Sequence, residues 1–213
     1  MRHFSVNDYN KSRDAYTQGW KIVDDTLYRL CRDHPSHDDR AAVNAKILII
    51  GRTYATGIER KVATTGVQGS SISQVADFFF MHRKEIDEWF LRLAKVFEPL
   101  ASSNISEILA VHGLISKRLT HLTRRKQLAR SFVSKYLHFH NSAVPIYDSV
   151  ASGFLRGLVP LRRIRDFQIP VPDCADPEYA DYVRRFAYLY QTIASHALPV
   201  TVRSLDSYLI SSS

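Results

Sequence analysis

The chain has 213 residues, of which 45% are hydrophobic, which suits one globular core or two small helical lobes and excludes an intrinsically disordered protein. Lysine and arginine total 29 against 21 acidic residues, a net charge of +8, so nucleic acid is an expected partner. The two cysteines, Cys31 and Cys174, form no CxxC motif, which argues against a thiolate zinc site and fits a reducing cytoplasm. No apolar run reaches the length of a membrane span and no apolar signal core is present, so we expect a cytoplasmic protein without membrane contact.

The first part of the chain shows helical spacing of its apolar residues. A helix is predicted over residues 20–30, and Asp38 or Asp39 is the expected cap of a second one, from Ala41 to about Thr53. The apolar run of this second helix predicts a central, fully buried element. A buried strand over the same run is the alternative, but it has no partner strand in the sequence.

The middle of the chain predicts two further helices. Ser70 or Ser71 opens a long helix that runs to Pro99. Asn104 or Ser106 is the expected cap of the next one. Neither segment alternates polar and apolar residues as a strand would, so both favour a helical fold.

The last part of the chain is predicted to be helical as well. A helix over 126–140 is followed by a turn through Pro145, and Asp148 stands at the expected start of the next helix. Asp176 or the proline after it begins the last long helix, and a short helix over 203–210 follows. The sequence therefore predicts an all-α protein.

Asp148 ends a strongly basic segment. No acidic residue occurs between Ile108 and Tyr147, whereas lysine and arginine recur there as Lys117, Arg118, Arg124, Arg125, Lys126, Arg130 and Lys135. A lone carboxylate after such a segment suggests an acid held against a polyanion such as DNA. A lysine in an apolar helix can lose its proton and attack an electrophilic sugar carbon, and a carboxylate at a helix N-terminus can stabilise a sugar cation. The alternative is that Asp148 only caps a helix and Lys135 is a solvated surface residue.

A second polar group follows the apolar run near residue 50. Gly51 and Gly57 after an apolar run suggest a phosphate-binding loop, but the fifth position after Gly51 is Thr56 and Ile58 follows Gly57, so the Walker pattern fails. Pocket-lining roles remain open for three side chains that emerge from this buried element, with a solvated helix end as the alternative: Arg52, Tyr54 and Arg60.

His138 and His140 form a His-X-His pattern. On a helix the two rings point about 200° apart and cannot share one metal ion, so no metal is expected. A nuclease that uses either histidine would depend on metal and remains a third interpretation. One of the two rings can instead hydrogen-bond the loop before Asp148.

Four segments resemble the 8-oxoguanine glycosylase-like bacterial branch of the helix-hairpin-helix DNA glycosylase superfamily. They are residues 130–140, 145–149, 205–209 and 45–60. The resemblance implies a two-lobed helical bundle, with lobes over 1–20 plus 140–213 and over 21–139 of a single glycosylase-like domain, and with DNA in the groove between them.

The resemblance also implies roles for individual residues. The family aspartate maps onto Asp148, whereas Lys135 lies closer to it in sequence than the family lysine does, so AP-lyase activity stays open. The hairpin position, residues 120–126, contains no glycine here. The implied substrate-binding residues are Trp20, Arg52, Tyr54, Arg60, His138 and His140, and the implied DNA-binding residues are Lys117, Arg118, Arg124, Arg125, Lys126 and Arg130.

The sequence therefore predicts a monomeric DNA glycosylase without a cofactor. It would hydrolyse the N-glycosidic bond of a damaged or modified base flipped out of DNA. Repair and defence against phage DNA with modified bases are both open. The alternative from another class is a non-catalytic basic helical DNA-binding module.

Overall fold

The structure is a computed structural model, and it describes residues 4–62, 70–196 and 198–213. Over these ranges the chain is all helical, as predicted, and extended backbone pairs only in an isolated antiparallel bridge between Val62 and Thr123. The elements are α1 (Val6–Gly19), α2 (Lys21–Asp33), α3 (Arg40–Thr53), α4 (Ile58–Lys61), α5 (Ser71–Met81), α6 (Arg83–Leu93), α7 (Ser102–Leu119), η1 (Arg124–Lys126), α8 (Arg130–His140), α9 (Ser149–Leu158), η2 (Leu161–Arg163), α10 (Pro177–Ser195) and α11 (Val202–Ser211). None of the described helices is both long and apolar enough to cross a membrane.

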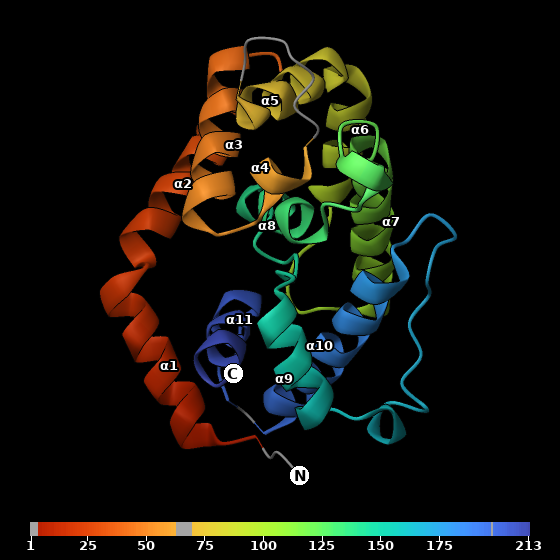
Figure 1. Cartoon of the computed structure of the whole chain (residues 1–213). Helices are drawn as coiled ribbons and strands as arrows, with labels where there is room; N and C mark the ends of the chain where they lie inside the picture. Colours follow the sequence, from red (N-terminus) through yellow and green to blue (C-terminus); the bar gives the residue numbers. More distant parts are fainter. Residues whose placement is uncertain (1–3, 63–69, 197) are drawn as a thin grey trace.

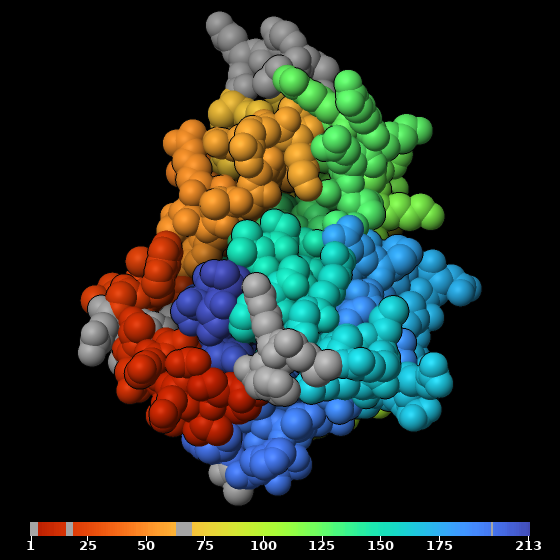
Figure 2. All heavy atoms as spheres, turned by 60° about the horizontal axis from the view of Figure 1, so that its bottom comes forward, coloured from red at the N-terminus to blue at the C-terminus, as the bar shows by residue number. Residues whose placement is uncertain are grey.

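Helix α8 lies at the centre of the molecule, where it packs against α2, α3 and α7 (Figure 1). Above it in this view, α3 and α5 pack together, and below it α9 and α10 do so. Helix α1 packs against α11, so the first and last helices lie side by side. Figure 2 shows α11 between α1 and α9 from a second direction. Segments from the two ends of the chain therefore pack against each other beside α9.

Side-chain caps define where several helices begin. Asp39 accepts hydrogen bonds from the first backbone N–H groups of α3, and Ser70 does the same for α5. Asp148 caps α9, and Asp176 caps α10 with Pro177 at the first helical position. Each cap satisfies N–H groups that the first turn of a helix leaves without a partner. These starts agree with the sequence predictions.

Three helix boundaries differ from the predictions. The long helix expected up to Pro99 is two helices, because the chain bends at His82 between α5 and α6. Ala101, and neither Asn104 nor Ser106, precedes α7. Helix α8 begins at Arg130, four residues later than predicted, because η1 occupies the preceding segment. The N-terminal helix α1 had no counterpart among the predicted elements.

The apolar run of α3 forms a helix and not a strand. Ile47 and Ile50 are fully buried, whereas Leu48 and Ile49 are only partly buried against the core. The prediction of a fully buried element is therefore wrong for one side of α3. Lys46 is also buried, and its ammonium group donates to the backbone carbonyl of His34.

Candidate active site

The loop between α8 and α9 is tied down on both sides before it reaches Asp148. The backbone N–H of Tyr147 donates to Ser134 Oγ on α8 at 2.9 Å. The hydroxyl of Tyr179 on α10 donates to the carbonyl oxygen of Pro145 at 2.7 Å. The start of α9, and with it Asp148, is therefore fixed relative to α8 and α10.

The two carboxylate oxygens of Asp148 have different surroundings. Oδ1 accepts from the backbone N–H groups of Val150 at 2.9 Å and Ala151 at 3.4 Å, which is the N-cap arrangement. Oδ2 lies 3.9 Å from Lys135 Nζ, and 31% of the Asp148 side chain is exposed. One oxygen therefore holds the helix, and the other faces an ammonium group near the surface.

Lys135 lies on α8 with 6% of its side chain exposed. Its ammonium donates to the carbonyl oxygen of Tyr54 at 2.9 Å and to Ser131 Oγ at 3.3 Å. Burial lowers the pKa of Lys135, and the negative charge of Asp148 opposes part of that shift. The structure thus brings together the two residues that the sequence singled out for catalysis, and it excludes a solvated surface position for Lys135.

Buried charges from α2 and α11 lie behind this pair. Arg203 Nε lies 2.6 Å from Asp24 Oδ2, and Arg203 Nη1 lies 2.5 Å from Asp206 Oδ2. Tyr54, whose carbonyl holds Lys135, also donates its hydroxyl to Asp24 Oδ1. We call Asp24, Lys135, Asp148, Arg203 and Asp206 the charge cluster.

The charge cluster contains more negative than positive groups. Its three carboxylates and two cations sum to −1 when every group is ionised. Burial raises the pKa of Asp206 to about 6, although the nearby cations Arg203 and Lys135 act in the opposite direction. A cluster with this balance is electrostatically suited to a positive charge that develops beside it.

The sequence analysis missed Asp24, Arg203 and Asp206. A signal for the two carboxylates was present, because each lies on the apolar face of its helix. Asp24 shares its face with Leu27 and Cys31, and all three are buried. Asp206 is likewise fully buried among the apolar residues of α11. An acid on an apolar helix face costs stability unless it is paired, so such positions mark partners or function.

The predicted pocket residues near α3 do not all point to the same place. Trp20 is 48% exposed, and its ring centroid lies 5.8 Å from that of Tyr54. Arg52 forms an ion pair with Glu59 at 3.2 Å on the surface. Arg60 is exposed on α4. Only Trp20 and Tyr54 are therefore linked by contacts to the Lys135–Asp148 pair.

His138 and His140 lie in the interior on different sides of α8. His138 Nδ1 donates to the carbonyl oxygen of Val144 at 2.8 Å, so its other nitrogen accepts from the Tyr28 hydroxyl. This is the predicted contact with the loop before Asp148, and burial lowers the pKa of His138 to about 3. The His140 ring stacks on His37 with centroids 5.8 Å apart. The fully buried His138 ring cannot contact a bound base without unpacking the core, so its predicted substrate-binding role conflicts with its position. His140 is half-buried, and its predicted role stays a prediction.

The described residues hold no group of three or more His, Cys, Asp or Glu side chains that could bind a metal ion.

The turn between α7 and α8 presents three exposed cations, Arg124, Arg125 and Lys126, which we call the basic turn. Arg125 and Lys126 have φ angles of 55° and 51°, a left-handed conformation that costs a residue with a side chain about 1 kcal/mol or more. The bridge between Thr123 and Val62 fixes the turn against the end of α4. The basic turn is thus a fixed and exposed cationic surface.

Other predicted DNA contacts lie close to the basic turn. Lys117 and Arg118 are exposed at the end of α7, although Arg118 forms an ion pair with Glu85 at 2.8 Å. Lys61 of α4 donates to the carbonyl oxygen of Leu128, which again joins α4 to the turn. Exposed cations from the end of α7 and from the turn therefore share one region of the surface, and the half-buried Lys61, which was not a predicted DNA contact, adjoins it.

Arg130 contacts acidic residues that the sequence did not indicate as its partners. Its guanidinium forms hydrogen bonds of 2.5 and 2.9 Å with Asp176, and it lies 2.9 Å from Glu178. It also lies over the ring of Tyr147. Arg130 therefore joins α8 to α10, and the prediction that it grips a DNA phosphate conflicts with these contacts.

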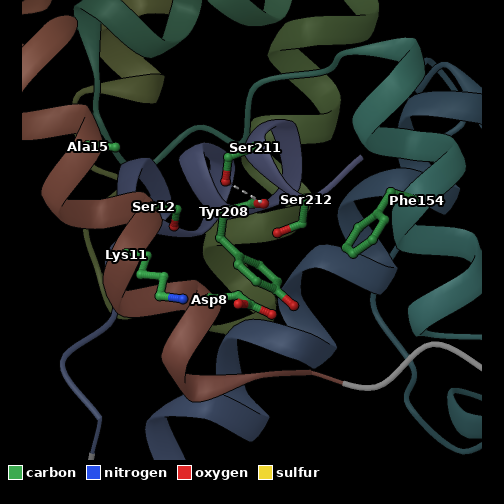
Figure 3. Close-up of a pocket in the computed structure, with 8 residues that line it drawn as sticks. All are labelled: Asp8, Lys11, Ser12, Ala15, Phe154, Tyr208, Ser211 and Ser212. Atoms are coloured by element: carbon green, nitrogen blue, oxygen red, sulfur yellow. Dashed lines mark hydrogen bonds between the residues drawn. The ribbon is translucent and has the colours of Figure 1, made fainter.

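A surface hollow of the described structure has no residue of the charge cluster in its lining. It encloses about 580 Å³ between α1, α9 and α11 (Figure 3). None of the sequence-predicted site residues lines it. The lining residues are Asp8, Lys11, Ser12, Ala15, Phe154, Tyr208, Ser211 and Ser212.

In comparisons with known proteins, no family model, no curated protein and no solved structure matches this chain.

Proposed function

We propose that the protein is a DNA glycosylase that hydrolyses the N-glycosidic bond of a damaged or modified base extruded from DNA. The observation that carries this proposal is the contact between a buried lysine and a capping aspartate, Lys135 and Asp148, at 3.9 Å. The carboxylate is the group that hydrolysis needs, and a lysine whose pKa is lowered by burial is the group that an additional lyase step needs. The sequence resemblance to helix-hairpin-helix glycosylases supports the same reaction.

Asp148 is the group that acts on the sugar. When the bond between C1′ and the base nitrogen breaks, the electron pair leaves with the base and positive charge develops on the sugar ring. Asp148 Oδ2, which faces the Lys135 ammonium and takes no part in the cap, is the oxygen that would stabilise that charge or direct a water molecule to C1′. The other four groups of the charge cluster, two carboxylates and two cations, sum to zero when ionised, so the net negative charge of the cluster is that of Asp148 itself.

Lys135 decides whether the enzyme has one activity or two. As a neutral amine it would attack C1′ and form a Schiff base, which leads to strand cleavage. As an ammonium it would only hold a phosphate or orient Asp148. A sugar that approaches from the surface would meet Asp148 before Lys135, because 31% of the Asp148 side chain is exposed and only 6% of the Lys135 side chain is.

DNA binding is assigned to the exposed cations of the basic turn and its neighbours. Phosphate contacts from such residues position the duplex without reading its sequence. Extruding a base costs a few kcal/mol, and stacking on an aromatic side chain returns part of this cost. The exposed ring of Trp20, next to Tyr54, is the stacking surface nearest to the Lys135–Asp148 pair by contacts.

The test is a panel of duplexes and single strands that carry damaged or modified bases, incubated with the protein and then with alkali. Cleavage that requires alkali identifies a glycosylase, cleavage without alkali identifies an additional lyase, and a borohydride-trapped adduct at Lys135 identifies the Schiff base. Panels of repair lesions and of phage-type modified bases separate repair from defence.

A non-catalytic DNA-binding module is the second candidate, favoured by the exposed cations of the basic turn. This module would bind the panel in a salt-dependent manner and release no base. Tight binding without an abasic product from any substrate would therefore favour the DNA-binding module over the glycosylase.

A further inference from the structure

We propose that Asp206 is a positioning residue of this site, which acts through Arg203, Asp24 and Tyr54 to favour the ammonium form of Lys135. The inference rests on the proposed function for its catalytic meaning, but the contact network behind it does not involve DNA. Asp206 lies on α11, 71 positions from Lys135 in sequence, and the sequence analysis assigned it no role.

A continuous path of contacts joins Lys135 to Asp206. The Lys135 ammonium binds the Tyr54 carbonyl, and the Tyr54 hydroxyl binds Asp24. Asp24 and Asp206 then share the guanidinium of Arg203, at 2.6 and 2.5 Å. Tyr54 therefore connects the lysine to the paired acids through both its backbone and its side chain.

The Asp206 carboxylate can accept more hydrogen bonds than its partners supply. The residue is fully buried, and Oδ2 is paired with Arg203, but Oδ1 has no hydrogen-bond partner among the described residues. A buried carboxylate with one unpaired oxygen is costly, and such a cost persists in proteins mainly where it serves a site. The Tyr182 hydroxyl of α10 is the other unpaired group that interacts electrostatically with Asp206.

The charged groups that act on Lys135 come from two elements, α9 and α11. Asp148 at the start of α9 and Asp206 on α11 both favour the ammonium form, whereas burial and Arg203 disfavour it. In turn, Lys135 and Arg203 favour the ionised form of Asp206, whereas burial, Asp148 and Asp24 disfavour it. His138, the remaining titratable neighbour of Arg203 on α8, is neutral at pH 7 because burial lowers its pKa to about 3.

The direction of the effect follows from these signs. The pKa of Asp206 is raised to about 6, so at pH 7 most of its carboxylate is ionised and supports the ammonium. Asp206→Asn removes that support, and the pKa of Lys135 then falls further. More of the lysine is a neutral amine at pH 7, so the variant is more reactive toward electrophiles at a given pH than the wild type.

The first experiment measures Lys135 directly and needs no DNA. The labelling rate of Lys135 by acetic anhydride is followed by mass spectrometry from pH 5 to 10 in the wild type and in Asp206→Asn. The expected result is a shift of the Lys135 profile by about 1 unit toward lower pH, or about tenfold faster labelling at pH 7. Asp39→Asn is the matched control, because it makes the same chemical change at an N-cap on α3 and is expected to leave the profile unchanged.

A second measurement uses the wild type alone and is independent of whether Asp206→Asn folds. The ¹³Cε resonance of Lys135, assigned by its loss in Lys135→Arg, is expected to show an inflection near pH 6 as Asp206 titrates. Asp206→Glu, which keeps the charge, is expected to retain the inflection. A resonance without an inflection between pH 5 and 7, or an unchanged labelling profile in folded Asp206→Asn, overturns the proposal.

The same variant separates this proposal from the proposed function. If the wild type forms borohydride-trapped adducts, the pH profile of trapping is expected to move with the labelling profile in Asp206→Asn. If labelling shifts but no substrate yields product, the coupling stands and the glycosylase proposal fails. If trapping occurs without any shift in either profile, the glycosylase stands and Asp206 is only structural.

Discussion

Replacement of Asp148 by asparagine gives the sharpest test of the charge argument. Asparagine caps a helix about as well as aspartate, so α9 keeps the hydrogen bonds that Oδ1 makes to Val150 and Ala151. What is lost is the negative charge of Oδ2, 3.9 Å from the Lys135 ammonium. Asp148→Asn therefore removes a charge and leaves the shape of the site almost unchanged.

The expected effect on the rate follows from Coulomb's law. Two unit charges about 4 Å apart interact by about 4 kcal/mol at an effective dielectric constant of about 20. A sugar cation held against Asp148 at a similar distance loses that stabilisation in the variant, so the excision rate falls by about three powers of ten. The folding free energy changes by about 1 kcal/mol or less, because the pair is partly exposed and the cap remains.

The assay is a single-turnover measurement of base release, with thermal unfolding of the same samples. Asp39→Asn makes the same change at an N-cap of the same kind on α3 and is expected to keep the full rate. Base release by Asp148→Asn within about tenfold of the wild-type rate would refute the assigned role of Asp148. A stability loss much larger than the predicted value would show that the carboxylate serves the fold.

Three further predictions concern binding and stability. Glutamine at all three positions of the basic turn is expected to lower the slope of log K against log salt for duplex DNA by up to about 2.7, and an unchanged slope would place the DNA elsewhere. Gly113→Ala puts a Cβ 2.1 Å from a backbone carbonyl oxygen and is expected to lower the free energy of unfolding by about 1–3 kcal/mol in a denaturant titration. In the same titration Gly153→Ala, whose Cβ meets open space, is expected to raise it by about 0.5–1 kcal/mol. Buried His112 and His138 have pKa values lowered to about 4 and about 3, so below pH 6.5 the unfolded chain binds more protons than the folded chain. The free energy of unfolding therefore decreases as the pH is lowered, by up to about 1.4 kcal/mol per pH unit for each ring, and proton uptake by folded Asp206 near pH 6 offsets part of this loss. A denaturant midpoint that does not decrease when the pH is lowered from 7 to 5 would contradict the buried positions of the two rings.

The helical fold and many of its boundaries could be predicted because caps and apolar spacing are local signals. Asp39, Asp148 and Asp176 each stand directly before an apolar-periodic segment, and each caps a helix. The break at His82 escaped prediction because apolar residues continue with helical spacing on both sides of it. Helix α1 escaped because few of its residues are apolar, so periodicity gives little signal there.

The candidate site was predictable only in part, because its members depend on tertiary pairing. Lys135 and Asp148 stood out by charge pattern, and their contact across the α8–α9 loop agrees with that choice. In the sequence Arg130 cannot be told from the other cations of the basic segment, and only the structure shows that its guanidinium donates to the Asp176 carboxylate. The partners of Arg203 were equally hidden, since no local pattern links it to residues on a distant helix.

The pair between Asp24 and Arg203 joins residues that are 179 positions apart. A ribosome therefore produces the lysine-bearing helix long before it produces the arginine that orders the acids behind it. Loop closure over such a span is entropically costly and occurs late, once most of the native topology exists. A polypeptide that lacks α11 would thus carry Lys135, Asp148 and Asp24 without Arg203 and Asp206, so synthesis through α11 is a precondition for the assembled site.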